Sequence, residues 1–454
     1  MIKSKPKILV LSHISELAGG AEMSLLEVMD IWVREHGVQP EFIIRKPIGS
    51  LAPALDKRGW KYHALPYTFW SEGQLPETPE QKHKAASQNT QAVLEIEKII
   101  QASQPDMVLT NSIVCPWAAL AAYYQQVPHT WFIREFGDLD HGRVFEIGQE
   151  QTFQDVDLLS QLVITNSEAL AKHASQYMPA DKVTTLYHPF DVDAMRAKAA
   201  QSVPSPFKSK DSLKLVIIGG IAETKGHQEV IQAVGELNKK GYDTEFCVIG
   251  RGDPAFIDML HGLMKKYKIE DKVHFAGFQK NPLALAAHAD VGVMSSRMEA
   301  FGRVTFEYMA LGKPVVGVGS GGTLEMVKDG SNGYLYKYRD TDSLLAGLMH
   351  YAKDPSLVAK HGQNSIAHAT AMMSGKHTID ALYKRAEKVM STDRATLPRP
   401  LHFSHTWLTY PQVADAYIRD LGAVSAKKLV TRQAKARVRY YGSNLKAQYR
   451  KLKG

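Results

Sequence analysis

The sequence of 454 residues has few cysteines and no long hydrophobic run, and each shortage excludes a class of protein. Its two cysteines, Cys115 and Cys247, are too far apart for a metal-binding spacing and offer no disulfide framework. The longest uncharged stretch, residues 107–133, is interrupted by polar residues and two prolines, which argues against a membrane-spanning helix. The apolar run Ile8–Leu11 is too short for the core of a signal peptide. These absences predict a globular protein of a reducing, cytoplasmic compartment.

The sequence also lacks a convincing metal-binding pattern. None of its 18 histidines has the H-x3-H or HExxH spacing of a zinc site. Three Asp-x-Asp pairs resemble those that bind divalent cations, but so short a pattern arises readily by chance. These pairs are Asp138/Asp140, Asp155/Asp157 and Asp191/Asp193. We therefore expect a protein that needs no metal and no cofactor.

The net charge of +8 is concentrated at the end of the sequence. Residues 421–454 contain ten Lys and Arg residues and no Asp or Glu, so the remainder carries a small negative net charge. An apolar stripe at helical spacing also runs through this tail, formed by Val438, Tyr441, Leu445, Tyr449 and Leu452. Such a helix either packs on the body of the protein or lies on an anionic membrane, where each basic residue contributes about 1 kcal/mol.

Short apolar runs alternate with segments of helical length over most of the sequence, as in parallel sheets covered by helices on both faces. The expected strands form two sets, separated by a Pro- and Ser-containing linker at 201–207. The first set is Lys7–Leu11, Glu41–Arg45, Met107–Thr110, Thr130–Ile133 and Leu162–Thr165, and the second is Leu213–Ile218, Thr244–Ile249, Lys272–Ala276, Val291–Met294 and Pro314–Val318. Two such units hold a ligand between them, at the carboxyl ends of the strands.

The strongest functional pattern is the segment Ser295–Val316. A turn at Gly302 leads from a loop into a helix, with Glu299 in the loop and Glu307 in the first turns of the helix. The free amides at the start of this helix are suited to phosphate oxygens, and the two carboxylates can accept hydrogen bonds from sugar and ribose hydroxyls. Two carboxylates beside a diphosphate require nearby cations.

Five glycine-containing segments occur in order around this pattern. They are Gly19-Gly20-Ala21-Glu22, Gly219–Gly226 with Lys225 inside it, Gly250-Arg251-Gly252, Val273–Phe278 and Gly321–Gly330. Any one of them is weak evidence. Together with the Glu-x7-Glu pair they resemble glycosyltransferase family 4, over roughly residues 7–388 and more strongly in the second half.

The resemblance implies an α/β protein of the GT-B fold, in which two Rossmann-like domains face each other across a cleft, extended here by basic helical residues. The implied divisions are an acceptor-side domain at 1–203, a nucleotide-sugar donor domain at 204–373, a crossover helix at 374–392 that packs back on the first domain, and a basic helical tail at 393–454.

The implied reaction moves a hexose or N-acetylhexosamine, with retention of anomeric configuration, from a nucleotide-diphosphate sugar to a glycan or lipid-linked glycan. Bacterial surface polysaccharide or glycoconjugate synthesis is the expected setting, with UDP-, GDP- and ADP-sugars as candidate donors. Residues 421–454 would hold the enzyme peripherally at the inner face of the membrane.

The resemblance also implies roles for individual residues. Lys225 and Arg303 would stabilise the leaving diphosphate, and Glu299 would orient the donor sugar. The full set of implied donor-binding residues is Gly19, Gly20, Gly220, Lys225, Gly250, Phe278, Glu299, Ala300, Phe301, Gly302, Arg303 and Glu307.

The chain departs from the family at two places. An arginine commonly follows the first glycine of the segment 219–226, where this chain has Gly220. Arg303 is the candidate replacement, because a guanidinium can bind phosphate oxygens in a bidentate manner. Many members also carry a histidine in the first domain, where this chain has Arg134, with His141 a few residues later. Each of these two residues either lines the acceptor side or is structural.

Two other classes of function stay open. A nucleotide-sugar epimerase or phosphorylase could use the same architecture, and a basic nucleic-acid-binding protein would explain the tail. The slightly acidic body and the lack of base-stacking motifs argue against nucleic acid as a partner. Both glutamates and Lys225 are present, which argues against an inactive binding homologue.

Overall fold

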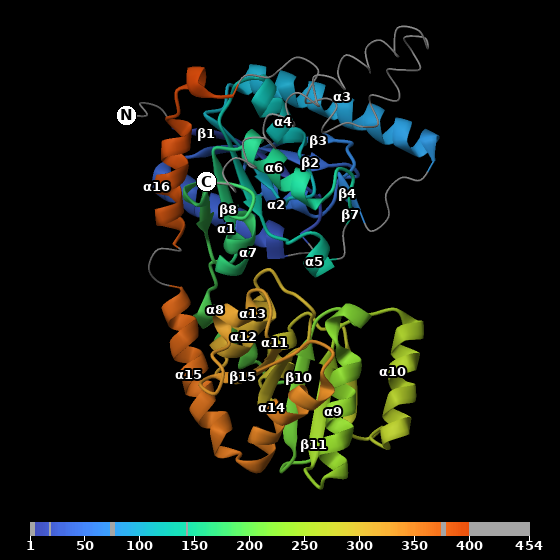
Figure 1. Ribbon diagram of the computed structural model, residues 1–454. Coiled ribbons are helices and arrows are strands. Elements are labelled where there is room, and N and C mark those ends of the chain that lie inside the picture. The colour runs from blue at the N-terminus through green and yellow to red at the C-terminus, as the bar shows by residue number, and fades with distance from the viewer. Residues whose placement is uncertain (1–4, 18–19, 73–77, 142–143, 374–377, 399–454) are drawn as a thin grey trace, which may run out of the picture.

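The computed structural model describes residues 5–17, 20–72, 78–141, 144–373 and 378–398. Two α/β domains lie one above the other in Figure 1, and the last long helix runs along the side of the N-terminal domain. Residues 399–454, which include the basic segment 421–454 and its apolar stripe, lie outside the described residues.

The N-terminal domain is built on a seven-stranded parallel sheet. In spatial order its strands are β3 (Lys61–Leu65), β2 (Gln39–Arg45), β1 (Lys7–Ser12), β5 (Met107–Asn111), β6 (His129–Ile133), β8 (Leu162–Thr165) and β9 (Val183–Thr185). Because β1 reads Lys-Ile-Leu-Val-Leu-Ser, successive apolar side chains enter different cores. Leu9 and Leu11 belong to one core and Ile8 and Val10 to the other, so helices cover both faces of the sheet.

Among the described residues, seven helices occur in the chain before β9, the last strand of this sheet. They are α1 (Gly20–His36), α2 (Leu51–Asp56), α3 (Pro79–Ser103), α4 (Trp117–Tyr124), α5 (Asp138–His141), α6 (Gln149–Leu159) and α7 (Glu168–Ala174), with a 3-10 turn at Ala180–Lys182. Two short strands, β4 (Ser71–Glu72) and β7 (Val144–Phe145), pair antiparallel beside the main sheet.

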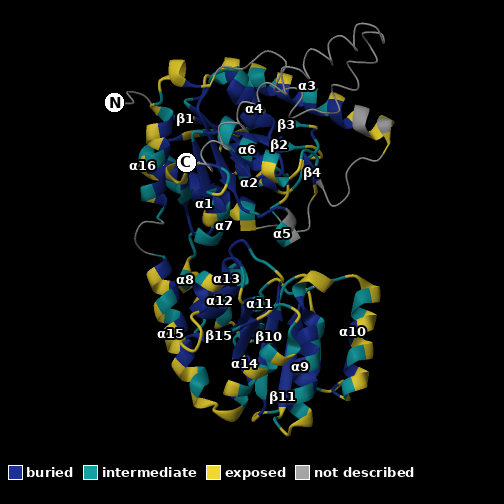
Figure 2. Ribbon diagram, in the orientation of Figure 1, coloured by how far each residue is buried: buried dark blue, intermediate teal, exposed yellow. Residues whose placement is uncertain are grey.

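The second domain has a six-stranded parallel sheet. In spatial order its strands are β12 (Val273–Gly277), β11 (Thr244–Ile249), β10 (Leu213–Ile218), β13 (Val291–Met294), β14 (Val315–Val318) and β15 (Gly333–Tyr336). The helices around it are α8 (Val192–Ala199), α9 (His227–Lys239), α10 (Pro254–Tyr267), α11 (Pro282–Ala286), α12 (Arg303–Ala310), α13 (Thr323–Met326), α14 (Thr341–Lys353) and α15 (Ser356–Met372), with a 3-10 turn at Glu223–Lys225. Figure 2 shows the strands buried and the outer helix faces exposed, as a covered sheet requires.

The chain enters the second domain earlier than the linker at 201–207 suggested. Helix α8 packs against α11 and α12, and the Arg196 guanidinium donates to the Ala310 carbonyl oxygen over 3.1 Å. Phe207, at the end of the expected linker, is buried in a core of the second domain. The crossing is therefore the segment 186–191, because the 201–207 segment is already packed on the second domain.

Helix α16 (Ile379–Met390) returns to the N-terminal domain, and a 3-10 turn at Arg394–Thr396 follows it. Its apolar face joins the core that contains Ile8 and Val10. Tyr383 stacks on His36 with ring centroids 3.5 Å apart, and its edge meets Trp32 at 5.5 Å. The C-terminal described segment thus ties the two domains together a second time.

These two facing Rossmann-like domains confirm the α/β, GT-B architecture expected from the sequence. Within the part of the chain that the structure describes, no helix is long and apolar enough to cross a membrane.

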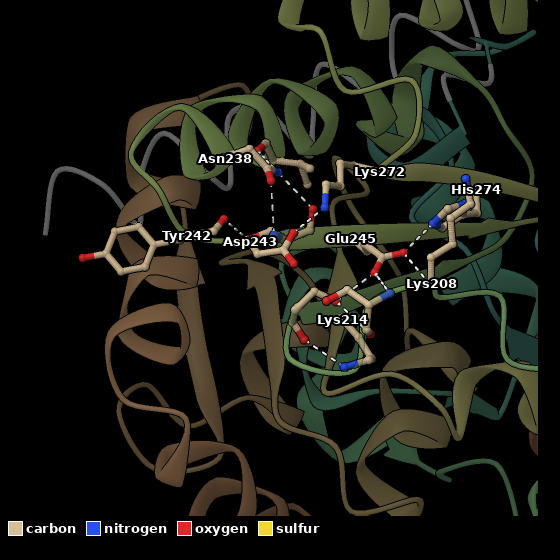
Figure 3. A network of polar contacts seen from close by, with 12 residues as sticks. Lys208, Lys214, Asn238, Tyr242, Asp243, Glu245, Lys272 and His274 are labelled. Atoms are coloured by element: carbon tan, nitrogen blue, oxygen red, sulfur yellow. Dashed lines mark hydrogen bonds and ion pairs between the residues drawn. The ribbon is translucent and has the colours of Figure 1, made fainter.

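A buried carboxylate anchors the segment that leads into β10 (Figure 3). Glu245 is 1% exposed and accepts hydrogen bonds from the amides of Lys208 and Ser209 at 2.8 and 2.7 Å and from the Ser212 hydroxyl at 2.9 Å. His274 pairs with it at 2.7 Å. Burial acts to raise the pKa of Glu245, but these hydrogen bonds outweigh it and lower the pKa to about 2.

We expect Glu245→Gln to lower the free energy of unfolding by about 1–3 kcal/mol at neutral pH, because it removes a buried charged acceptor. The ordinary pKa of 4.5 falls to about 2 on folding, so the stabilisation is present above pH 4.5 and is lost as the pH falls toward 2. Urea unfolding between pH 7 and pH 3 measures it. The wild type should lose stability faster than the variant below pH 4.5, with exposed Glu270→Gln as the matched control. Equal slopes in wild type and Glu245→Gln would contradict the assignment.

Candidate active site

The two motif glutamates follow the carboxyl end of β13. Helix α12, which begins in this region, lies on the side of the second domain nearest the N-terminal domain (Figure 1). Glu299 stands in the loop after β13, and Glu307 is in the second turn of α12. Gly302 caps this helix with φ of 88°, a left-handed conformation that favours glycine. The turn at Gly302 therefore starts the helix directly after the Glu299 loop.

Two further glycines, Gly321 and Gly322, hold this loop in place. The Gly322 amide donates to the Glu299 carbonyl oxygen over 2.9 Å. A Cβ atom on Gly322 would lie 2.3 Å from the Phe301 carbonyl oxygen, and one on Gly321 would lie 2.2 Å from that of Glu299. Only residues without a side chain allow this close approach of two backbones.

Each motif glutamate is paired with a cation. The ammonium of Lys225 contacts Glu299 Oε1 at 2.6 Å, and Nε of Arg303 contacts Glu307 Oε1 at 3.0 Å. Burial raises the pKa of Glu307, whereas Arg303 acts in the opposite direction. The sequence-predicted Lys225, Glu299, Arg303 and Glu307 are thus brought together as two carboxylate–cation pairs.

The Lys225 segment is fixed to the Glu299 loop by hydrogen bonds to its backbone carbonyl oxygens. The Ser295 hydroxyl donates to the Lys225 carbonyl oxygen at 2.6 Å, and the Arg297 amide donates to the Thr224 carbonyl oxygen at 3.0 Å. Two segments that are 70 residues apart in sequence therefore form one unit. This unit sets the distance between the lysine and the glutamate.

The N-terminal domain reaches the same place through Gly20, the first residue of α1. A Cβ atom on Gly20 would lie 3.6 Å from Cδ of Arg303. Gly19 lies outside the described residues. A Cβ atom on Gly220 would have its nearest neighbour, the Arg251 carbonyl oxygen, at 4.0 Å, so the position where the family commonly has an arginine is open.

An aromatic side chain stands exposed beside the carboxyl ends of β11 and β12. Gly250 follows β11, and Phe278 follows β12 with 58% of its surface exposed. The guanidinium of Arg251 lies 4.6 Å from the centre of the Phe278 ring. The sequence places Arg251 within a glycine segment but predicts no role for it. Its position between two glycines was the available signal.

Ala300 and Phe301 are both buried. The Phe301 ring packs against Tyr187 at 5.6 Å and Phe190 at 5.9 Å, and both of these rings lie in the crossing segment 186–191. Phe190 also stacks on Phe306 at 4.1 Å. The donor-side loop is therefore packed against the chain that joins the domains, a contact that the sequence did not suggest.

Arg134 follows β6 and is buried. Its Nε donates to Asn111 Oδ1 at 2.6 Å, whereas Nη2 has no hydrogen-bond partner among the described residues. Burial lowers the pKa of Arg134 to about 10, and the carboxylates of Glu22, Glu135 and Glu27 oppose that shift, so the guanidinium stays charged at neutral pH. His141 ends α5, and its side chain lies outside the described residues.

Glu27 and His188 form a further pair that sequence reasoning missed. Their Oε2 and Nε2 atoms are 3.4 Å apart. Burial raises the pKa of Glu27, with Arg303 and Arg134 opposing. Burial lowers the pKa of His188 to about 3, so this imidazole is neutral. Charged groups of both domains thus influence one another near Arg303.

The three Asp-x-Asp pairs have structural partners. Asp140 accepts from the Phe136 and Gly137 amides, Asp157 pairs with Lys182 at 2.6 Å, and Asp191 caps α8. Across the residues that the structure describes, no group of three His, Cys, Asp or Glu residues is placed to hold a metal ion.

Two family models match the chain. Residues 19–194 match the model described as Glycosyltransferase Family 4, and residues 200–368 match the model described as Glycosyl transferases group 1. The two matches follow the two domains in order and together cover most of the sequence.

Curated relatives share this assignment. The chain is 29% identical over 208 residues to N-acetyl-alpha-D-glucosaminyl L-malate synthase of Bacillus anthracis, covering 45% of this chain and 54% of that protein. It is 25% identical over 382 residues to D-inositol 3-phosphate glycosyltransferase 2 of Catenulispora acidiphila, covering 78% and 86%. The chain spans about half the length of several of the relatives it matches.

Solved structures share the fold. A glycosyltransferase from Rickettsia africae superposes with a TM-score of 0.67 at 18% identity, over 86% of this chain and all of that one. Anabaena HepE, crystallised in complex with UDP, superposes with a TM-score of 0.64 at 19% identity, over 85% and 99%. The chain is a GT-B protein, and it belongs to glycosyltransferase family 4.

We expect Gly322→Ala to open the Glu299 loop, because its Cβ atom would overlap the Phe301 carbonyl oxygen. The expected cost is about 1–3 kcal/mol of stability, with faster hydrogen exchange in residues 299–303. Hydrogen-exchange mass spectrometry and thermal unfolding measure both effects. Gly262→Ala is the matched control, since a Cβ atom there meets nothing within 4 Å. Unchanged exchange in the loop would show that the glycine contact does not hold it.

Proposed function

We propose that the protein is a glycosyltransferase that moves a sugar from a nucleoside-diphosphate sugar to an acceptor hydroxyl. The observation that carries the proposal is the double carboxylate–cation pair at the start of α12, formed by Glu299 with Lys225 and by Glu307 with Arg303. Membership of glycosyltransferase family 4 supports it.

A donor would exchange partners with these pairs. Its diphosphate carries negative charge and would attract Lys225 and Arg303, while the free amides at the start of α12 would bind phosphate oxygens. Glu299 and Glu307, released from their cations, would accept hydrogen bonds from the sugar and the ribose hydroxyls. The hydroxyls would then offset the loss of each cation from its carboxylate.

The exposed Phe278, with Arg251 over its ring, would support the nucleotide base. We propose UDP as the nucleotide. The solved structure of HepE in complex with UDP supports this choice.

In the proposed transfer, the bond between the sugar C1 and the β-phosphate oxygen breaks and a bond from C1 to the acceptor oxygen forms on the same face. The acceptor hydroxyl proton passes to the leaving phosphate oxygen, so no separate base is required and the anomeric configuration is retained. Lys225 and Arg303 stabilise the charge that develops on the leaving diphosphate. Positioning supplies much of the remaining acceleration.

We propose that the acceptor is a glycan or lipid-linked glycan with a free hydroxyl, and that Arg134 is the residue that contacts it. Its Nη2, which has no hydrogen-bond partner among the described residues, can donate to the oxygen of the acceptor hydroxyl. Three carboxylates already balance this guanidinium, which favours a neutral hydroxyl over an anion.

Arg303→Ala is expected to weaken donor binding about 10- to 100-fold, because it removes a charge-assisted contact to the diphosphate. Isothermal titration with UDP and UDP-glucose, with and without EDTA, measures this, and EDTA should make no difference. Arg34→Ala is the control, since Arg34 is an exposed residue of α1 paired with Glu35. Donor affinity that is the same in Arg303→Ala and Arg34→Ala would overturn the site.

Measurements of UDP release and of the product's configuration separate a transferase from the alternative enzyme classes. UDP release that requires an acceptor, and a product whose anomeric configuration by NMR matches that of the donor, supports a retaining transferase over an epimerase or phosphorylase. Arg134→Met should keep donor affinity and slow transfer relative to donor hydrolysis. Equal slowing of transfer and hydrolysis would remove Arg134 from the acceptor side.

We also propose that the basic residues 421–454 bind anionic membranes, because ten positive charges without an acidic residue are concentrated there. The full chain is expected to float with phosphatidylglycerol liposomes, and a chain ending at Pro400 is not. Binding should fall steeply between about 50 and 500 mM salt. Neutral phosphatidylcholine liposomes are the control. Equal flotation of the two chains with phosphatidylglycerol liposomes would contradict membrane binding by residues 421–454.

A further inference from the structure

A carboxylate of the second domain reaches the start of a helix in the first. Glu325, on α13, accepts from the Glu168 amide at 3.0 Å through Oε2 and from the Ala169 amide at 2.6 Å through Oε1. These are the first two amides of α7. The hydroxyl of Tyr187, in the crossing segment, donates to Oε2 at 2.8 Å. Three donors of the N-terminal side thus meet on one side chain of the second domain.

This contact has the chemistry of a helix cap supplied from another domain. The first amides of a helix lack partners within it and favour a negative charge. Ser167 caps α7 locally by accepting from the Leu170 amide at 3.0 Å, which leaves the amides of residues 168 and 169 for Glu325. Burial raises the pKa of Tyr187, and Glu325 adds to the effect, so the hydroxyl keeps the proton that it donates.

The same short segment braces the donor-side loop. Glu325 is three residues after Gly322, whose amide holds the Glu299 carbonyl oxygen at 2.9 Å. Phe301 of that loop packs on Tyr187, which itself donates to Glu325. The tie between the domains and the support of Glu299 therefore share residues 321–325 and Tyr187.

A second contact links the two domains at α5. The Arg297 guanidinium donates to the Leu139 carbonyl oxygen through Nε at 3.0 Å and Nη2 at 2.6 Å. Arg297 is two residues before Glu299. Two residues near the Glu299 loop therefore contact the N-terminal domain: Arg297, which precedes Glu299, and Glu325, which follows the supporting Gly322.

We propose that Glu325 is a positioning residue that couples the Glu299 loop to the relative position of the two domains through the start of α7. This inference rests on the proposed glycosyltransferase function. Glu325 itself would touch neither donor nor acceptor. When the tie breaks, the N-terminal domain moves away from the donor loop, and a donor bound on the second domain no longer faces the acceptor side.

The test compares Glu325→Ala, Glu325→Gln and wild type as full chains. In Glu325→Ala the amides of Glu168 and Ala169 should lose at least tenfold of their protection from hydrogen exchange, without any ligand present. The kcat with UDP-glucose and acceptor should fall at least tenfold, while the donor Kd changes less than threefold. Glu325→Gln should be intermediate, because its amide oxygen can accept from one backbone N–H and its NH2 group opposes the other.

Glu236→Gln is the control, since Glu236 is half-buried on the same domain and makes only a weak pair, at 3.8 Å, with the exposed Lys239. Unchanged exchange at residues 168 and 169 in Glu325→Ala would overturn the tie. Faster exchange with unchanged kcat would overturn the coupling. If Glu325→Ala folds poorly, Glu325→Gln provides the same two readouts.

Failure of the proposed function looks different. It would appear as normal UDP-glucose affinity in Arg303→Ala, or as no affinity in the wild type, while the ligand-free exchange result for Glu325 would stand by itself. A small-angle scattering profile supplies an independent readout, because Glu325→Ala should have the larger radius of gyration.

Discussion

In the proposed site, Glu299 and Glu307 stand beside a diphosphate, so cations must neutralise the two carboxylates, and this charge balance constrains the rest of the site. Lys225 forms a salt bridge with Glu299, and Arg303 forms one with Glu307. Arg303 and Glu307 share α12, whereas Lys225 and Glu299 come from two separate segments that must be held together. The Ser295 hydroxyl fixes the lysine segment, and Gly322 fixes the loop of Glu299. A small displacement of either support separates charge from countercharge, which explains why glycines and backbone hydrogen bonds, rather than flexible side chains, build this region.

The domain interface depends on the same supports. Tyr187 and Phe190 of the crossing segment pack on Phe301, and Tyr187 also donates to Glu325. Helix α16 then returns to the N-terminal core, so the chain passes between the domains twice. A GT-B protein needs the domains to approach while the donor is held. Here the residues that join the domains are in contact with the residues that position the first glutamate, as the coupling proposed for Glu325 requires.

Much of the fold follows from the sequence because the central strands are apolar on both faces. The expected strands Leu213–Ile218, Thr244–Ile249 and Val291–Met294 have the bounds that the structure gives. The sequence does not predict the two-residue strands β4 and β7, nor three strands of the main sheets, β3, β9 and β15, all of which lie at a sheet edge. An edge strand has one neighbouring strand, and β3 reads Lys-Tyr-His-Ala-Leu with all five residues only partly buried or exposed. Such a segment lacks the continuous apolar run that identifies a central strand.

The site was predictable only where a local pattern carries it. Glu299, Glu307 and Arg303 belong to one loop and helix, whereas Glu325 acts on amides more than 150 residues away, which no local pattern reveals. Arg303 illustrates a consequence of the open position at Gly220. A cation on α12 shares its helix with Glu307, and it also lies against Gly20 of the first domain and 5.5 Å from the Phe190 ring. In the proposed site, a cation on α12 would link binding of the diphosphate to binding of the ribose by Glu307 and to the position of the N-terminal domain. An arginine at residue 220 would follow β10 instead, and would not share a helix with Glu307.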